Sequence, residues 1–328
     1  MKKDKLQLFV AKLLESSLVY SPVNKDRGVF VEKIDDFEQI DWSGTLPENN
    51  FNKFVLPNRE VLLRIQKNKV KENFDFEKEP NKVLLGVNIL DLQALTLLAQ
   101  VFEKDAYVEK RWQNVFLIGF SNGLPADFRK YKVFHAEFEE NILEHVMFDV
   151  FIEKQKNGNL LFFSGSEKGQ ILLENNKIRD YENIEFAGLV PEQGVSAKIG
   201  QNRKAVENSR GHKLWDELAE ICLACGKCSM ACPTCFCFDT RDEAIFDGVE
   251  KVREKASCFY SEFSETAGGK KDLDSVKKRL YFWYYHKFVR TPEELSYYGC
   301  VSCMRCFKVC PVGINIAKNL QNLQALQK

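Results

Sequence analysis

The sequence predicts two domains in series, an α/β domain built on a mixed sheet and then a mostly α-helical domain. Its length of 328 residues suits two domains at roughly 100–200 residues each. A strand–helix–strand succession in the first half is typical of α/β folds. All 11 cysteines lie between Cys222 and Cys310, so the last third has a chemistry of its own.

The α/β domain is assigned to residues 1–195. The apolar pattern predicts, in chain order, a helix over 6–17, a hairpin of 18–23 and 29–34, a buried strand over 83–90, a helix over 92–104 with Asp91 as its N-cap, and a buried strand over 115–120. Alternating residues over 131–138, 148–153 and 159–164 indicate an antiparallel edge, with a turn at Asn157-Gly158.

The helical domain is assigned to residues 196–328. Pro191, Gly194 and Gly200 mark the boundary between the domains. Helical sequences over 212–221 and 314–328 flank the cysteine-rich part, and 67 residues separate Cys232 from Cys300. That interval is too long for a minimal ferredoxin of short hairpins, so we expect the helical type of ferredoxin domain.

Charge and hydropathy exclude several classes of function. The 47 basic and 47 acidic side chains cancel, which argues against nucleic-acid binding. No segment approaches the roughly 20 apolar residues of a membrane helix. The N-terminus begins like a signal peptide, but Lys12 and Glu15 interrupt its apolar part, and no cleavage site follows. We expect a soluble, cytoplasmic protein.

Two cysteine runs carry the chemistry. Residues 222–233 and 300–311 both read C-x2-C-x2-C-x3-C-P, the spacing that holds a [4Fe–4S] cube. In two-cluster ferredoxins the fourth cysteine of each run serves the other cluster. We therefore assign one cluster to Cys222, Cys225, Cys228 and Cys310, and the other to Cys300, Cys303, Cys306 and Cys232. The alternative is a zinc-organised scaffold, but structural zinc usually joins two C-x2-C pairs.

Three cysteines remain after this assignment, namely Cys235, Cys237 and Cys258. They are candidates for a third iron–sulfur site with His286 as the fourth ligand, because imidazole replaces thiolate at some irons. The alternative is that they are buried free thiols, which behave as small apolar side chains.

The sequence contains no catalytic motif that we recognise. There is no dinucleotide fingerprint, P-loop, nucleophile elbow or H-E-x-x-H. Two clusters without substrate chemistry describe a non-catalytic electron carrier.

Segments throughout the chain resemble the iron–sulfur beta subunit of cytoplasmic [NiFe] hydrogenases, or sulfhydrogenases, and the related A subunit of anaerobic sulfite reductase. The matching segments are LPNREVLL (56–63), LLGVNILDLQAL (84–95), CPTCFCFD (232–239), SCFYSEFSETAGG (257–269), YYHKF (284–288) and GCVSCMRCFKVCPVGINI (299–316). The resemblance implies an electron relay between a flavin subunit that handles NAD(P)H and a catalytic subunit. A hydrogenase is the leading context, sulfite reductase is the second, and a freestanding ferredoxin-like carrier is a third alternative.

This chain departs from the family at three places. Asn88-Ile-Leu-Asp91 replaces the usual Arg-Pro-Cys-Asp, and residues 121–126 replace a Cys-Phe-Cys segment. A metal site formed by those N-terminal cysteines therefore cannot exist here. Lys270 stands where the family has histidine, which leaves His286 as the candidate ligand of the third site.

Overall fold

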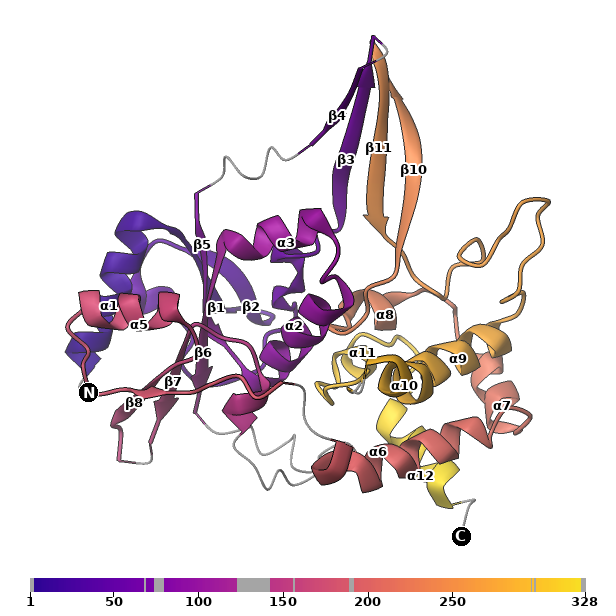
Figure 1. The fold of residues 1–328 in the computed structure, drawn as a ribbon. Helices are drawn as coiled ribbons and strands as arrows, with labels where there is room; N and C mark the ends of the chain where they lie inside the picture. Colours follow the sequence, from indigo (N-terminus) through magenta and orange to yellow (C-terminus); the bar gives the residue numbers. More distant parts are fainter. Residues whose placement is uncertain are drawn as a thin grey trace. The chain divides into compact units, whose positions relative to one another are not determined.

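The computed structural model describes residues 3–67, 69–73, 80–122, 142–155, 157–188, 192–295, 297 and 299–325. These residues separate into two compact units (Figure 1). The first unit comprises the described parts of 1–55, 76–130 and 138–190. The second comprises those of 56–75 and 191–328. The chain therefore enters the second unit early, returns to the first, and completes the second with its last third.

A seven-stranded mixed sheet forms the centre of the first unit, as predicted. Its order is β2-β1-β5-β6-β7-β8-β9. The strands are β1 (Leu18–Lys25), β2 (Gly28–Ile34), β5 (Lys82–Val87), β6 (Val115–Ser121), β7 (Val150–Lys154), β8 (Leu160–Ser164) and β9 (Glu182–Asn183). The strands β1, β5, β6 and β7 run parallel, whereas β2 and β8 are antiparallel to their neighbours β1 and β7.

Helices cover both faces of this sheet (Figure 1). On one face, α1 (Lys3–Ser16) and α5 (Glu167–Asn175) pack on alternate strand residues such as Val83, Ile118 and Val150. The other face carries α2 (Ile89–Val101) and α3 (Ala106–Gln113). Gly119 in β6 allows close packing there, because a Cβ atom would lie 2.3 Å from the Phe151 ring. Short 3-10 turns occur at Phe37–Gln39, Phe51–Phe54 and Ile142–His145.

The predicted boundary between β5 and α2 was wrong. The strand ends at Val87, and Asn88 is the N-cap, whose side chain accepts a 3.0 Å hydrogen bond from the Asp91 N–H. The helix then ends at Val101 instead of 104. The physical cause of the error is that every residue from Leu90 through Leu98 is buried. A helix buried on every side shows no amphipathic period, so its first turn resembles the end of a strand.

The other strand predictions are confirmed within the described residues. The first hairpin pairs Lys25 with Gly28, and β7 pairs with β8 across the turn at Gly158. β5, α2 and β6 form the expected βαβ unit, with the two strands parallel. The segment predicted as a strand over 131–138 lies outside the described residues.

Helices around a core of aromatic side chains make up much of the second unit. They are α6 (Glu192–Glu207), α7 (Leu214–Ile221), α8 (Lys227–Ala231), α9 (Val276–Tyr285), the π-helical turn η5 (His286–Arg290), α10 (Thr291–Leu295), α11 (Arg305–Lys308) and α12 (Ile316–Ala325). The fully buried Trp215 packs edge-on against Tyr284, with ring centroids 5.0 Å apart. In the part of the chain that the structure describes, no helix is long and apolar enough to cross a membrane.

A four-stranded antiparallel sheet, which the sequence did not predict, completes the second unit. Its order is β10-β11-β3-β4. The strands are β3 (Arg59–Gln66), β4 (Lys69–Glu72), β10 (Phe238–Ile245) and β11 (Gly248–Lys255). The long β10–β11 hairpin occupies part of the interval between the cysteine runs and pairs with a strand from the first quarter of the chain (Figure 1).

Candidate metal centre

The two cysteine runs fold into loops of the same backbone shape. In the first loop Ala224 and Gly226 have φ angles of 49° and 72°, and in the second Ser302 and Met304 have φ angles of 60° and 57°. These are the third and fifth positions of each run. The short helices α8 and α11 then begin directly after Gly226 and Met304. Left-handed residues at matched positions make each loop curl, which turns successive cysteine side chains toward one centre.

The first cavity in this unit is lined by cysteines from both runs. Its walls include Cys222, Cys225, Cys228 and Cys310, and Cys306 also contacts it. Phe259, Leu280 and Trp283 provide apolar walls. The thiol of Cys225 is exposed, and so are Leu223 and Val312 at the rim. This cavity therefore reaches the protein surface.

The second cavity is lined by the other set of cysteines. Cys300, Cys303 and Cys306 come from the second run, and Cys232 comes from the end of the first. Cys232 and Cys303 are buried, with exposed fractions of 7% and 6%. Each cavity therefore brings together the four thiols that the spacing argument groups, three from one run and one from the other.

Four of the thiols that line the two cavities have raised pKa values and so favour the protonated state. Burial raises the pKa of Cys228 to about 12 and that of Cys300 to about 12. Burial likewise raises the pKa values of Cys222 and Cys306. Because only the thiolate binds a metal, an incoming metal must displace these protons. Neutral, clustered thiol donors suit iron or another thiophilic metal and fit a [4Fe–4S] cube.

Hydrogen bonds to sulfur differ between the two cavities. In the first, the Ala224 N–H donates to Cys222 Sγ at 3.4 Å and the Ile314 N–H donates to Cys310 Sγ at 3.3 Å. In the second, the Lys287 ammonium lies 3.2 Å from Cys232 Sγ. Hydrogen bonds to cluster sulfurs tune reduction potentials.

Lys287 and Cys232 form a buried pair. A hydrogen bond from Cys235 and the charge of Lys287 hold the pKa of Cys232 well below its ordinary value, although burial acts in the opposite direction. Burial alone would lower the pKa of Lys287, but the neighbouring Cys232, Cys235 and Cys300 outweigh it and raise that pKa. The sequence motif YYHKF contains this lysine, and nothing in the local pattern indicates that it is buried.

The three remaining cysteines lie near one another, although the third site stays a prediction. Cys235 contacts Cys232. Burial raises the pKa of Cys258, and Cys237 lies close enough for its charge to raise that pKa further. The ring of His286 packs between Phe236 and Phe282. Burial, then the charges of Lys287 and Arg290, lower the pKa of His286 to about 4. No three His, Cys, Asp or Glu side chains of the described ranges are arranged to hold a single metal ion.

Comparison with known proteins agrees with this geometry. Residues 221–314 match the family model of the 4Fe-4S dicluster domain. This segment is therefore similar to 4Fe-4S dicluster domains. The whole chain is also similar to sulfhydrogenase 2 subunit beta of Pyrococcus furiosus, with 28% identity over 333 positions that cover 96% of this chain and 95% of the relative. The resemblance seen in the sequence motifs is confirmed. No solved structure matches the chain.

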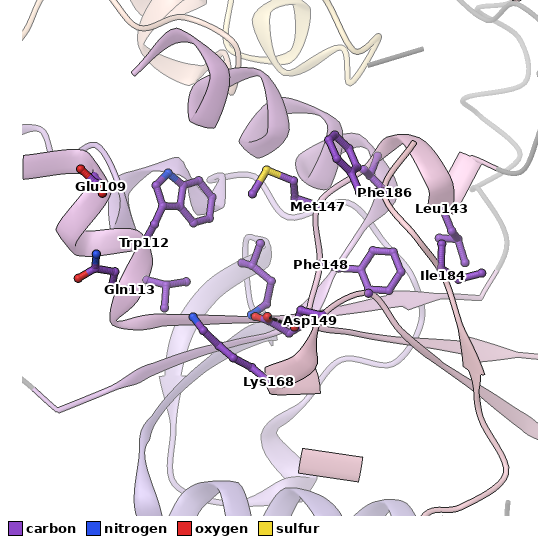
Figure 2. Close-up of a pocket in the computed structure, with 15 residues that line it drawn as sticks. Glu109, Trp112, Gln113, Leu143, Met147, Phe148, Asp149, Lys168, Ile184 and Phe186 are labelled. Carbon is purple, nitrogen blue, oxygen red and sulfur yellow. Dashed lines mark hydrogen bonds between the residues drawn. The ribbon is translucent and has the colours of Figure 1, made fainter. Parts of the chain in front are cut away.

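A pocket of about 530 Å³ lies in the first unit. Trp112, Met147, Phe148 and Phe186 supply much of its apolar lining, whereas Asp149 and Lys168 are polar (Figure 2). No cysteine is among the described residues that line it.

Asp149 joins three segments at the edge of this pocket. Its carboxylate accepts hydrogen bonds from the Leu117 N–H at 2.8 Å and from the Ser166 hydroxyl at 2.6 Å. Burial nevertheless raises the pKa of Asp149 above its ordinary value of 3.8, because it outweighs those hydrogen bonds. The folded protein therefore binds the carboxyl proton more tightly than the unfolded chain does.

This shift predicts a pH-dependent stability difference between the wild type and Asp149→Asn. Binding of the Asp149 proton adds to the free energy of unfolding. This stabilisation is complete below pH 3.8 and is lost as the pH rises from there through the folded-state pKa. We expect the free energy of unfolding of the wild type to fall relative to that of Asp149→Asn over this window and the difference to stay constant above it. Urea unfolding at a series of pH values measures the two free energies of unfolding. A wild type that gains stability relative to Asp149→Asn as the pH rises would contradict the prediction.

Proposed function

We propose that this protein is a non-catalytic electron-transfer subunit of a soluble, cytoplasmic, multi-subunit oxidoreductase. It relays electrons through two [4Fe–4S] clusters between a flavin-containing subunit that handles NAD(P)H and a catalytic subunit, for which a [NiFe] hydrogenase is the leading candidate. Cys222, Cys225, Cys228 and Cys310 would hold the first cluster, and Cys232, Cys300, Cys303 and Cys306 the second. A third cluster at Cys235, Cys237, Cys258 and His286 remains an additional candidate.

The observation that carries this proposal is the sharing of cysteines between the two loops. The first cavity is lined by the first three thiols of the first run together with Cys306 and Cys310 of the second. The second cavity is lined by three thiols of the second run and by Cys232 of the first. The similarity to a sulfhydrogenase beta subunit over almost the whole chain supports the hydrogenase context. When bound, each cluster accepts and passes on one electron at a time.

The protein's own residues give the two clusters different surroundings. The first cavity is accessible to a partner subunit, because Cys225, Leu223 and Val312 at its rim are exposed. The second cavity is enclosed by buried residues, among them Val301 and Met304. Burial and apolar walls keep water away from cluster sulfurs, which sets the potential. The first cluster therefore exchanges electrons with a partner subunit, and the second transfers electrons within the protein.

Anaerobic purification followed by iron and acid-labile sulfide analysis tests the cofactor. We expect about eight irons and an equal amount of sulfide per chain for two cubes, or about twelve for three. A colourless protein that contains zinc and lacks sulfide would overturn the proposal in favour of a zinc-organised scaffold.

The partner subunits need a second experiment. Gentle anaerobic isolation of the tagged protein from its own cells should return a flavoprotein and a hydrogenase subunit in stoichiometric amounts. Recovery with a sulfite reductase subunit would place it in that complex instead. Recovery without any stoichiometric partner would identify a freestanding carrier.

A further inference from the structure

Lys287 lies between the two cysteine runs with its ammonium group fully enclosed. Its side chain is 4% exposed, and Nζ lies 3.2 Å from Cys232 Sγ, 3.0 Å from Thr234 Oγ1 and 2.9 Å from the Gly299 carbonyl oxygen. Cys232 ends the first run, and Gly299 directly precedes Cys300 of the second. One charged group therefore contacts both chain segments that line the second cavity.

The backbone around Lys287 is shaped to hold it in place. Lys287 belongs to the π-helical turn η5, a rare conformation that often occurs at functional sites. Gly299 packs against it so closely that a Cβ atom there would lie 2.4 Å from the Lys287 carbonyl oxygen. The Thr234 hydroxyl also donates to the Gly299 carbonyl, at 2.7 Å. These contacts fix the position of the ammonium group relative to the cavity.

A buried lysine is costly unless anions lie close to it. Two of its partners, Thr234 and the Gly299 carbonyl, are neutral. The third partner, Cys232 Sγ at 3.2 Å, is a proposed cluster ligand and places the ammonium beside the charge that a bound cluster would carry. Low-dielectric surroundings strengthen the attraction between the ammonium and any negative charge in the second cavity. In the first cavity, Cys222 Sγ and Cys310 Sγ instead accept hydrogen bonds from neutral backbone N–H groups.

We propose that Lys287 is a positioning residue that stabilises the reduced form of the cluster held by Cys232, Cys300, Cys303 and Cys306 and thereby raises its reduction potential. This inference rests on the proposed function. Reduction adds one electron, and so one negative charge, to the cluster, and no bond is made or broken. A fixed cation beside Cys232 favours that added charge.

The test compares redox titrations of the intact protein, monitored by electron paramagnetic resonance, for the wild type, Lys287→Met, Lys287→Gln and Lys287→Arg. We expect the neutral variants to have a lower midpoint potential at the second cluster. At the potential that reduces half of this cluster in the wild type, the ratio of reduced to oxidised cluster should be about tenfold lower in these variants, which corresponds to a midpoint shift of about 59 mV for one electron. The arginine variant keeps the charge and should restore most of the ratio. The first cluster should titrate as in the wild type.

Lys308→Met is the matched control, because Lys308 lies in the second run but is exposed. Solvent screens its charge, so its removal should leave both midpoints nearly unchanged. Loss of the second cluster from both neutral variants together with its retention in Lys287→Arg also supports a need for the charge. Unchanged midpoints in the neutral variants, or loss of the cluster from all three variants, would overturn this inference. A wild-type protein without clusters would instead overturn the proposed function.

Discussion

Cys303→Ala and Cys310→Ala are expected to remove different clusters, although both residues belong to the second run. Cys303 lines only the second cavity, whereas Cys310 lines only the first. Each variant should lose about four of about eight irons and one of the two sets of magnetic resonance signals. Loss of either cluster should also interrupt electron flow between an artificial donor and acceptor.

Two further variants make this test reciprocal. Cys228→Ala should reproduce the spectrum of Cys310→Ala, and Cys232→Ala should reproduce that of Cys303→Ala. If each run instead held its own cube, Cys303→Ala and Cys310→Ala would lose the same signal. That result would reject the shared arrangement while leaving the presence of two clusters intact.

Loss of either partner of the buried Glu60–Arg253 ion pair is expected to destabilise the second unit strongly. Glu60 in β3 and Arg253 in β11 are both 5% exposed at the side chain, and Nε of Arg253 donates to Glu60 Oε1 at 2.7 Å. Removing one partner leaves a buried charge without its counterion, which costs about 3–5 kcal/mol. Urea or thermal unfolding of Glu60→Ala and Arg253→Ala measures the loss.

The double variant Glu60→Leu/Arg253→Met provides the control. Apolar side chains of similar volume need no counterion, so the free energy of unfolding should return close to the wild-type value or exceed it. A double variant whose loss equals the sum of the two single losses would show that the pair does not act as a unit.

The similarity of residues 221–314 to a 4Fe-4S dicluster domain was predictable because cysteine spacing is a local property. Within each run, the loop needs only short-range geometry to bring three thiols together, and the sequence records that spacing directly. The fourth thiol of each set comes from the other run. The βαβ unit was predictable for a similar reason, since β5 and β6 are buried strands with clear ends. The exact start of α2 was not, because Asn88 and Asp91 are both good N-cap residues and the buried helix has no polar face.

The four-stranded sheet could not be predicted from local patterns. β10 is mostly exposed and charged, so it lacks the alternation that marks a half-buried strand. Its neighbour β11 pairs with β3, which lies far away in the sequence. Lys287 was overlooked for a related reason: lysine is almost never fully buried, and only the folded chain brings Cys232 and Gly299 to it.

The pairing of β3 with β11 limits how this protein can be divided into fragments for expression. A fragment that begins at residue 196 would contain every cysteine but would lack β3 and β4. Arg253 would then lose its carboxylate partner, and β11 would present an open edge of unpaired backbone groups that other chains can join. Truncation at the apparent domain boundary should therefore give aggregated material. The shortest portion that is useful for cluster studies must carry residues 56–73 as well, so the intact chain is the practical choice.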